Sequence, residues 1–93
     1  MSALSGQTTV TTAGTAVPLA SLPINGPLIV KALDTNTNPV AIGNDGSNDI
    51  TLSTGLRLSA GEEVYLGYVG NLASIYLDST TNGEGVAWLA LNI

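Results

Sequence analysis

The sequence predicts an all-β chain, folded as a small antiparallel β-sandwich of about eight short strands. Short runs of apolar and β-branched residues alternate with clusters of Gly, Pro, Asn and Asp, and no stretch keeps a helical period over several turns. A chain of 93 residues fits one domain, and two packed sheets can bury faces that a single sheet would expose. The strand order stays open between jelly-roll-like and immunoglobulin-like, because strand count does not determine connectivity.

The N-terminal segment is predicted to have two parts. Residues 1–6 show no alternation and are expected to be a flexible arm, so that the β-sandwich domain spans residues 7–93. The stretch "QTTVTT", from Gln7 to Thr12, alternates and is rich in threonine, which favours a strand. This strand either stays in the chain's own sheet or adds to a sheet edge of a neighbouring molecule. The residues expected to contact that partner are Thr8, Thr9 and Val10.

The next two segments are predicted strands of different kinds. "AVPLA", from Ala16 to Ala20, is extended, but Pro18 cannot donate to a ladder, so this strand belongs at an edge or a strand end. "PLIVKAL", from Pro27 to Leu33, alternates, and Lys31 is expected on the solvent side. The residues expected on its opposite, buried face are Leu28, Val30 and Ala32.

A turn over "DTNTNP" leads to a short strand, "VAIG", from Val40 to Gly43. The loop "NDGSND" follows, and "ITL", from Ile50 to Leu52, is predicted to pair briefly.

The stretch "LRLSAGEEVYLGY", from Leu56 to Tyr68, predicts a hairpin that reverses over residues 59–62. Its second strand would bury Val64 and expose Tyr65. "ASIYLD", from Ala73 to Asp78, repeats the alternation. Tyr65 and Tyr76 are therefore predicted to face outward, on strands that could be neighbours. Such a tyrosine pair is interpreted as a sheet-stabilising cross-strand contact, a protein contact or a sugar-stacking platform.

The last segment, "VAWLALNI", from Val86 to Ile93, is apolar on both faces. That pattern is typical of a central strand or of one covered by a partner. Trp88, in the middle of this strand, is predicted to be a core residue.

Charge is sparse and acidic. Two basic residues face seven acidic ones, giving a net charge of −5, and 10% of residues are charged. A basic stripe that could neutralise phosphates is missing, so nucleic acid is not an expected partner, and an anionic membrane surface would repel the chain. No apolar run approaches the roughly 20 residues that span a bilayer. A surface of hydroxyls and amides with so few charges favours a protein packed against neighbours.

The chain has no histidine or cysteine, which removes Ser-His and Cys-His nucleophiles and imidazole or thiolate metal sites. The seven acids are all predicted in or beside turns, where carboxylates are ordinarily solvated, so a paired-carboxylate enzyme is not expected. The oxygen-rich loop "NDGSND" suits a hard cation in composition, but a plain turn explains it better, and no metal or cofactor is predicted. The residues of this weak candidate loop are Asn44, Asp45, Asn48 and Asp49.

Five segments together carry a resemblance: "TTVTTAGTAVPL", "PLIVKAL", "VAIGN", "GLRLSAGEEVYLG" and "NLASIYLDSTTNGEGVAWLAL". In this order they resemble small structural proteins of tailed bacteriophages and prophages, over about Gln7 to Leu91. One departure is Ala60, where proline is frequent, and it affects only the stiffness of that turn.

The resemblance implies a non-enzymatic virion protein, assembled in the host cytoplasm. Capsid decoration, in which the chain binds the assembled shell, is the first expectation. The partners so implied are the major capsid protein or other virion proteins, and the chain is expected to be a homo-oligomer. A head–tail or tail accessory protein and a carbohydrate-binding module for host adhesion are the alternatives.

Overall fold

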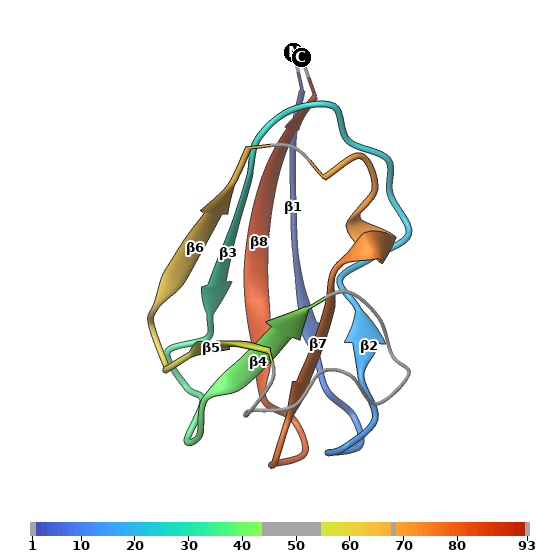
Figure 1. Ribbon diagram of the computed structural model, residues 1–93. Coiled ribbons are helices and arrows are strands. Elements are labelled where there is room, and N and C mark those ends of the chain that lie inside the picture. Colours follow the sequence, from blue (N-terminus) through green and yellow to red (C-terminus); the bar gives the residue numbers. More distant parts are fainter. Residues whose placement is uncertain (1, 44–54, 68, 93) are drawn as a thin grey trace.

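The computed structural model describes residues 2–43, 55–67 and 69–92, and these residues form two four-stranded antiparallel sheets packed face to face (Figure 1). The predicted all-β sandwich of about eight strands is confirmed. The strands are β1 (Ser2–Thr9), β2 (Val17–Pro18), β3 (Leu28–Ala32), β4 (Val40–Gly43), β5 (Leu56–Leu58), β6 (Glu63–Leu66), β7 (Tyr76–Ser79) and β8 (Gly85–Asn92), with one 3₁₀ helix, η1 (Leu72–Ser74), before β7.

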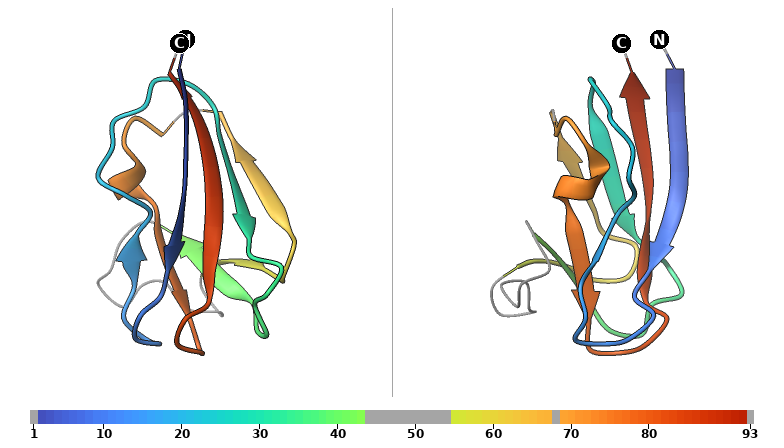
Figure 2. Two further views of the ribbon diagram at one scale, coloured as in Figure 1. Left: turned by 180° about the vertical axis from the view of Figure 1, so that it is seen from behind. Right: turned by 90° about the vertical axis from the view of Figure 1, so that its right-hand side faces the viewer.

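The strand order is β1-β8-β3-β6 in one sheet and β2-β7-β4-β5 in the other. The pairs β1–β8, β2–β7, β3–β6 and β4–β5 are nested, as though one long hairpin had been rolled into two layers. This is the jelly-roll order, and it removes the immunoglobulin-like alternative. Both described chain ends lie at the same end of the molecule (Figure 2).

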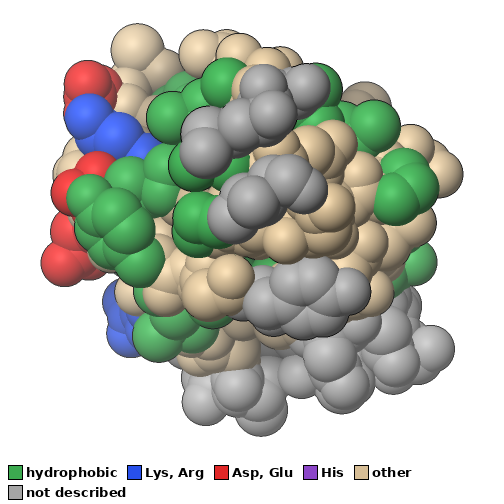
Figure 3. Space-filling model, turned by 90° about the horizontal axis from the view of Figure 1, so that it is seen from above, with side chains coloured by type: hydrophobic (Ala, Val, Ile, Leu, Met, Phe, Trp, Pro, Cys, Tyr) green, Lys and Arg blue, Asp and Glu red, His purple; other side chains and the backbone are tan. Residues whose placement is uncertain are grey.

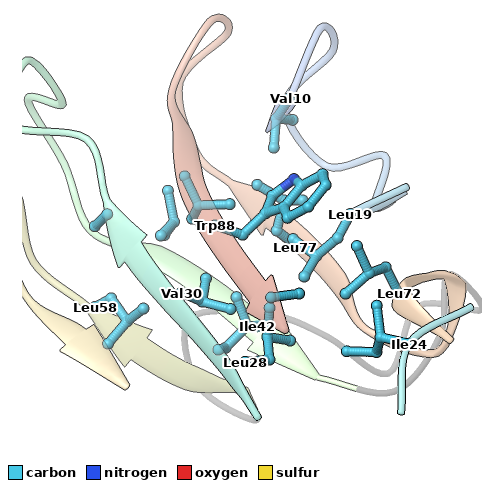
Figure 4. Close-up of a cluster of buried hydrophobic side chains, with 14 residues drawn as sticks. Val10, Leu19, Ile24, Leu28, Val30, Ile42, Leu58, Leu72, Leu77 and Trp88 are labelled. Carbon is cyan, nitrogen blue, oxygen red and sulfur yellow. The ribbon is translucent and has the colours of Figure 1, made fainter. Parts of the chain in front are cut away.

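The core fills the space between the sheets, and each strand contributes alternate residues to it. In β3, Leu28, Val30 and Ala32 are buried and Lys31 is exposed, as the sequence predicts. Trp88 extends from β8 into the same cluster, which Figure 4 shows. The largest fully buried side chains are Leu28, Leu72, Leu77, Val10, Val30, Val40 and Val86.

β8 is a central strand, which explains why its sequence is apolar on both faces. It lies between β1 and β3, with Trp88 opposite Gly6 on one side and opposite Val30 on the other. The predicted position of Trp88 in the core is confirmed, since its side chain is 8% exposed.

The predicted hairpin over Leu56–Tyr68 is wrong. β5 pairs with β4 in one sheet, and β6 pairs with β3 in the other, so the segment crosses between the layers. The turn itself forms where expected: the Glu62 N–H donates to the Ser59 carbonyl at 2.9 Å, and Gly61 has a φ of 82°. The Gly61 N–H then donates to the Ala32 carbonyl at 3.1 Å, which ties the crossing to the end of β3.

The predicted N-terminal arm is also wrong for the described residues 2–6. They form the first part of β1, in register with β8 from Ser2 opposite Asn92 onward. The long apolar strand β8 offers ladder groups along its whole length, and the uncharged segment satisfies them. The strand predicted over Gln7–Thr12 ends at Thr9, and Val10 follows it into the core with its side chain fully buried.

A further difference lies before β7. The strand predicted over Ala73–Asp78 begins only at Tyr76, because η1 occupies the preceding turn. The Asn71 side chain accepts the Ala73 N–H at 2.9 Å and the Leu22 N–H at 3.3 Å, so it caps η1 and holds the β2–β3 connection beside it.

Two acids that the sequence places in solvated turns are buried, and they fix loops at the end of the sandwich opposite the termini. Asp78 is 8% exposed, and its Oδ1 accepts the backbone N–H groups of Gly14 at 3.0 Å and Ser79 at 2.8 Å. Glu84 is 4% exposed and accepts hydrogen bonds from the β3–β4 loop. Both carboxylates therefore serve the fold, because each accepts charge-assisted hydrogen bonds from a loop that is remote in sequence.

Candidate functional site: the outer face of the β1-β8-β3-β6 sheet

An apolar row crosses the outer face of the β1-β8-β3-β6 sheet. Tyr65 on β6 lies opposite Ile29 on β3, and Ile29 lies opposite Leu89 on β8. The alternation that buries Leu28, Val30 and Trp88 turns these three side chains outward. Tyr65 is 73% exposed and Leu89 is 46% exposed, whereas Ile29 between them is half-buried.

The row borders a shallow open groove of about 260 Å³ at the end of the sheet that carries the termini. Tyr65 contributes a phenol hydroxyl to this groove, and the other lining side chains are hydrocarbon. Viewed from that end, hydrophobic side chains are exposed beside a small charged group (Figure 3). The groove is lined by Pro27, Leu28, Ile29, Tyr65, Leu89 and Leu91.

A second hollow, of about 200 Å³, continues the same face toward the charged group. Lys31 lies opposite Glu63 across the β3–β6 ladder, and its Nζ is 3.8 Å from Asp34 Oδ1. Both members of the Lys31–Asp34 ion pair are largely solvated, so this pair contributes little to stability. The face is thus apolar at one end and carries charges of both signs at the other.

The predicted outward orientation of Tyr65 is confirmed, but its pairing with Tyr76 is wrong. Tyr76 is half-buried and begins β7, in the other sheet, where it lies opposite Pro18 of β2 and Gly43 of β4. The two tyrosines therefore form neither a cross-strand pair nor a shared platform, and Tyr65 has Ile29 as its described cross-strand neighbour.

The three N-terminal residues predicted to contact a partner also differ in how exposed they are. Thr9 is exposed, while Thr8 is half-buried and its hydroxyl donates to the Leu19 carbonyl. Val10, fully buried, has no surface to offer a partner.

Sequence reasoning missed Ile29, Leu89 and Leu91 as surface residues. The signal was present in β8, whose apolar residues on both faces predicted either a central position or a covering partner. β8 is central, as one part of that alternative predicted, and its outer face still exposes Leu89, whereas a covering partner stays a prediction.

The weak metal candidate, Asn44, Asp45, Asn48 and Asp49, lies outside the described residues, as does the short strand predicted over Ile50–Leu52. Within residues 2–43, 55–67 and 69–92, no three acidic side chains gather as a metal site would require. The same residues include no helix of the length and apolarity that crossing a membrane takes.

No protein-family model matches the chain, and a comparison with curated proteins finds no significant match.

Proposed function

We propose that the chain is a non-enzymatic structural protein of a bacteriophage virion, a capsid decoration protein that binds the assembled shell through the outer face of the β1-β8-β3-β6 sheet. The exposed row of Tyr65, Ile29 and Leu89 carries this proposal. An aromatic anchor beside aliphatic side chains is the composition found at the centre of protein interfaces.

The chemistry of this face suits an uncharged protein surface. Its groove is hydrocarbon apart from one phenol, so contact with a partner removes apolar area from water and desolvates few polar groups. Lys31 and Glu63 stand at the border of the row, where a partner leaves them hydrated. Binding of this type resists salt, because little of the contact is ionic.

Two further observations support a virion role. The segments quoted above resemble those of small structural proteins of tailed phages, and the strand order is that of a jelly roll, an architecture that includes viral capsid domains. Fold analogy alone does not assign function, so the exposed apolar face remains the main argument.

The carbohydrate-binding alternative loses the feature that favoured it. Jelly rolls also include lectin domains, but the groove beside Tyr65 offers a sugar one hydroxyl, and Tyr76 lies in the other sheet. A head–tail or tail accessory protein would use the same apolar face, and only its place on the particle would differ.

Co-purification tests the proposal. Virions of the phage or prophage that encodes the chain should carry it in many copies per particle, and purified chain should rebind shells stripped of it, with equal saturation at about 0.1 M and about 1 M NaCl. Virions that lack the chain, or binding abolished by high salt, would remove the proposal. Labelling of tails alone would favour the accessory role.

A further inference from the structure

Among the described residues four strands lie at sheet edges, and they differ in how they are protected against pairing with other chains. β2 has two residues and contains Pro18, and β5 has three residues and contains Arg57. β6 has four residues, with Glu63 at its start. Short length, proline and charge are the usual devices that blunt an edge. β1 has none of them: it is eight residues long, and its sequence, SALSGQTT, has no charge and no proline.

The ladder shows which β1 groups face away from the sheet. The Leu91 N–H donates to the Pro27 carbonyl and the Leu33 N–H donates to the Gly85 carbonyl, so odd-numbered residues of β8 bond to β3. Even-numbered residues of β8 therefore bond to β1, where their partners are also even-numbered. The odd-numbered residues of β1 direct their N–H and C=O groups outward, and they are Ala3, Ser5, Gln7 and Thr9.

We propose that β1 is a dimerisation edge, at which a second copy of this chain adds its own β1 antiparallel about a two-fold axis. The β1-β8-β3-β6 sheets of the two copies then form one continuous sheet. This inference goes beyond the proposed function and does not depend on it, because it uses the edge of the sheet and leaves its outer face free.

A second copy fits this edge because the edge is complementary to itself. Two antiparallel β1 strands centred on Gly6 place Ser5 opposite Gln7 and Ala3 opposite Thr9, so all the outward backbone groups find partners. The side chains that meet are small or uncharged, so the net charge of −5 brings no like charges together along the seam.

Gly6, at the centre of that seam, is constrained from inside each copy. A Cβ at Gly6 would lie 2.8 Å from Cζ2 of Trp88, so the indole occupies the space that a side chain would need. The ring covers the glycine on the core side, as aromatic residues do for glycines in edge strands. β1 pairs with β8 without a break from Ser2 to Thr9 and is the last strand of its sheet (Figure 2, right).

A proline substitution in β1 can disrupt dimerisation at this edge without disrupting the fold of each copy. Ser5→Pro removes an outward N–H and leaves the bonds between β1 and β8 in place, whereas Ser5→Ala keeps the N–H and is the matched control. Sedimentation velocity of the full chain from about 5 µM to about 1 mM should show a monomer–dimer equilibrium for the wild type and Ser5→Ala. Ser5→Pro should raise the dissociation constant at least about tenfold.

Amide hydrogen exchange gives a second readout at single residues. At low concentration the even-numbered amides of β1 should be protected and the amides of Ser5, Gln7 and Thr9 should exchange; at high concentration those three should also become protected. If Ser5→Pro does not fold, Gln7→Lys, which places a charge on the edge, replaces it. A wild type that stays monomeric to about 1 mM, or a dimer unchanged in the folded edge variant, would overturn the proposal.

Discussion

The carboxylate of Glu84 accepts both the backbone N–H of Thr37, at 2.9 Å, and the Thr37 hydroxyl, at 2.6 Å. Glu84 directly precedes β8, and Thr37 lies in the connection from β3 to β4, so this contact fixes the loop where the chain passes between the sheets. Burial by itself would raise the pKa of Glu84, but the hydrogen bonds from Thr37 and from the Asn38 N–H outweigh it and lower the pKa below its ordinary value.

This contact predicts acid sensitivity. Because the pKa of Glu84 is lower in the folded chain than in the unfolded one, its contribution is fully present above the unfolded value near 4.5 and is lost as pH falls through the folded value. Glu84→Gln should lower the free energy of unfolding by about 1–3 kcal/mol at pH 7, and by less at about pH 3. Urea unfolding at several pH values measures both.

Thr37→Val is the companion variant, because it removes the hydroxyl donor and keeps the backbone N–H. Thr37→Val should reduce the loss of unfolding free energy at low pH without abolishing it. An unfolding free energy whose pH dependence is the same in wild type and Glu84→Gln would show that Glu84 does not hold the loop.

The start of β8 predicts a steric effect at Gly85. A Cβ there would lie 2.3 Å from the Thr8 carbonyl oxygen and 2.9 Å from Thr9 Cα, both on the β1 backbone. Gly85→Ala should therefore force β1 and β8 apart and cost about 2–4 kcal/mol of unfolding free energy. Gly67→Ala is the control, because its Cβ would meet nothing within 4 Å, and its effect should stay within about 0.5 kcal/mol. Equal melting temperatures for the two variants would contradict this.

The buried indole of Trp88 predicts that the fold tolerates phenylalanine at this position. Its Nε1 is buried and has no hydrogen-bond acceptor among the described residues, so the indole N–H is desolvated without compensation. Trp88→Phe removes this donor while keeping an aromatic ring, and it should cost no more than about 1 kcal/mol, whereas Trp88→Ala should cost about 3–5 kcal/mol. Chemical unfolding followed by circular dichroism compares them, and a similar loss for both variants would count against an unpartnered N–H.

Alternation in the sequence identified strands and faces well, but it could not assign strands to sheets. Leu58 and Val64 are inward in a hairpin and in a crossing alike, so the same pattern fits both. What separates a hairpin from a crossing is pairing with other strands: β6 pairs with β3, and β5 pairs with β4. The same limit explains the tyrosines: the pattern gave Tyr65 and Tyr76 an outer face but not a common one.

The buried acids show a second limit. Asp78 and Glu84 lie beside turn sequences, which favours solvated carboxylates. Each accepts a hydrogen bond from a donor that is remote in sequence: the bond from Gly14 to Asp78 spans 64 residues, and that from Thr37 to Glu84 spans 47. No local pattern records such partners. The residues that form the outer apolar face were recognised only in part, because Leu89 and Trp88 look alike until the strand is placed between two neighbours.

The most direct test of the central claim compares two exposed leucines on opposite sheets. Leu89, 46% exposed, lies in the proposed contact face, and Leu56, 51% exposed, lies on β5 in the other sheet. Binding of Leu89→Asp and Leu56→Asp to shells stripped of the chain should be titrated at about 1 M NaCl. Leu89→Asp should weaken binding at least about 30-fold, while Leu56→Asp should bind as the wild type does. Wild-type binding by Leu89→Asp, or an equal loss in both variants, would contradict it.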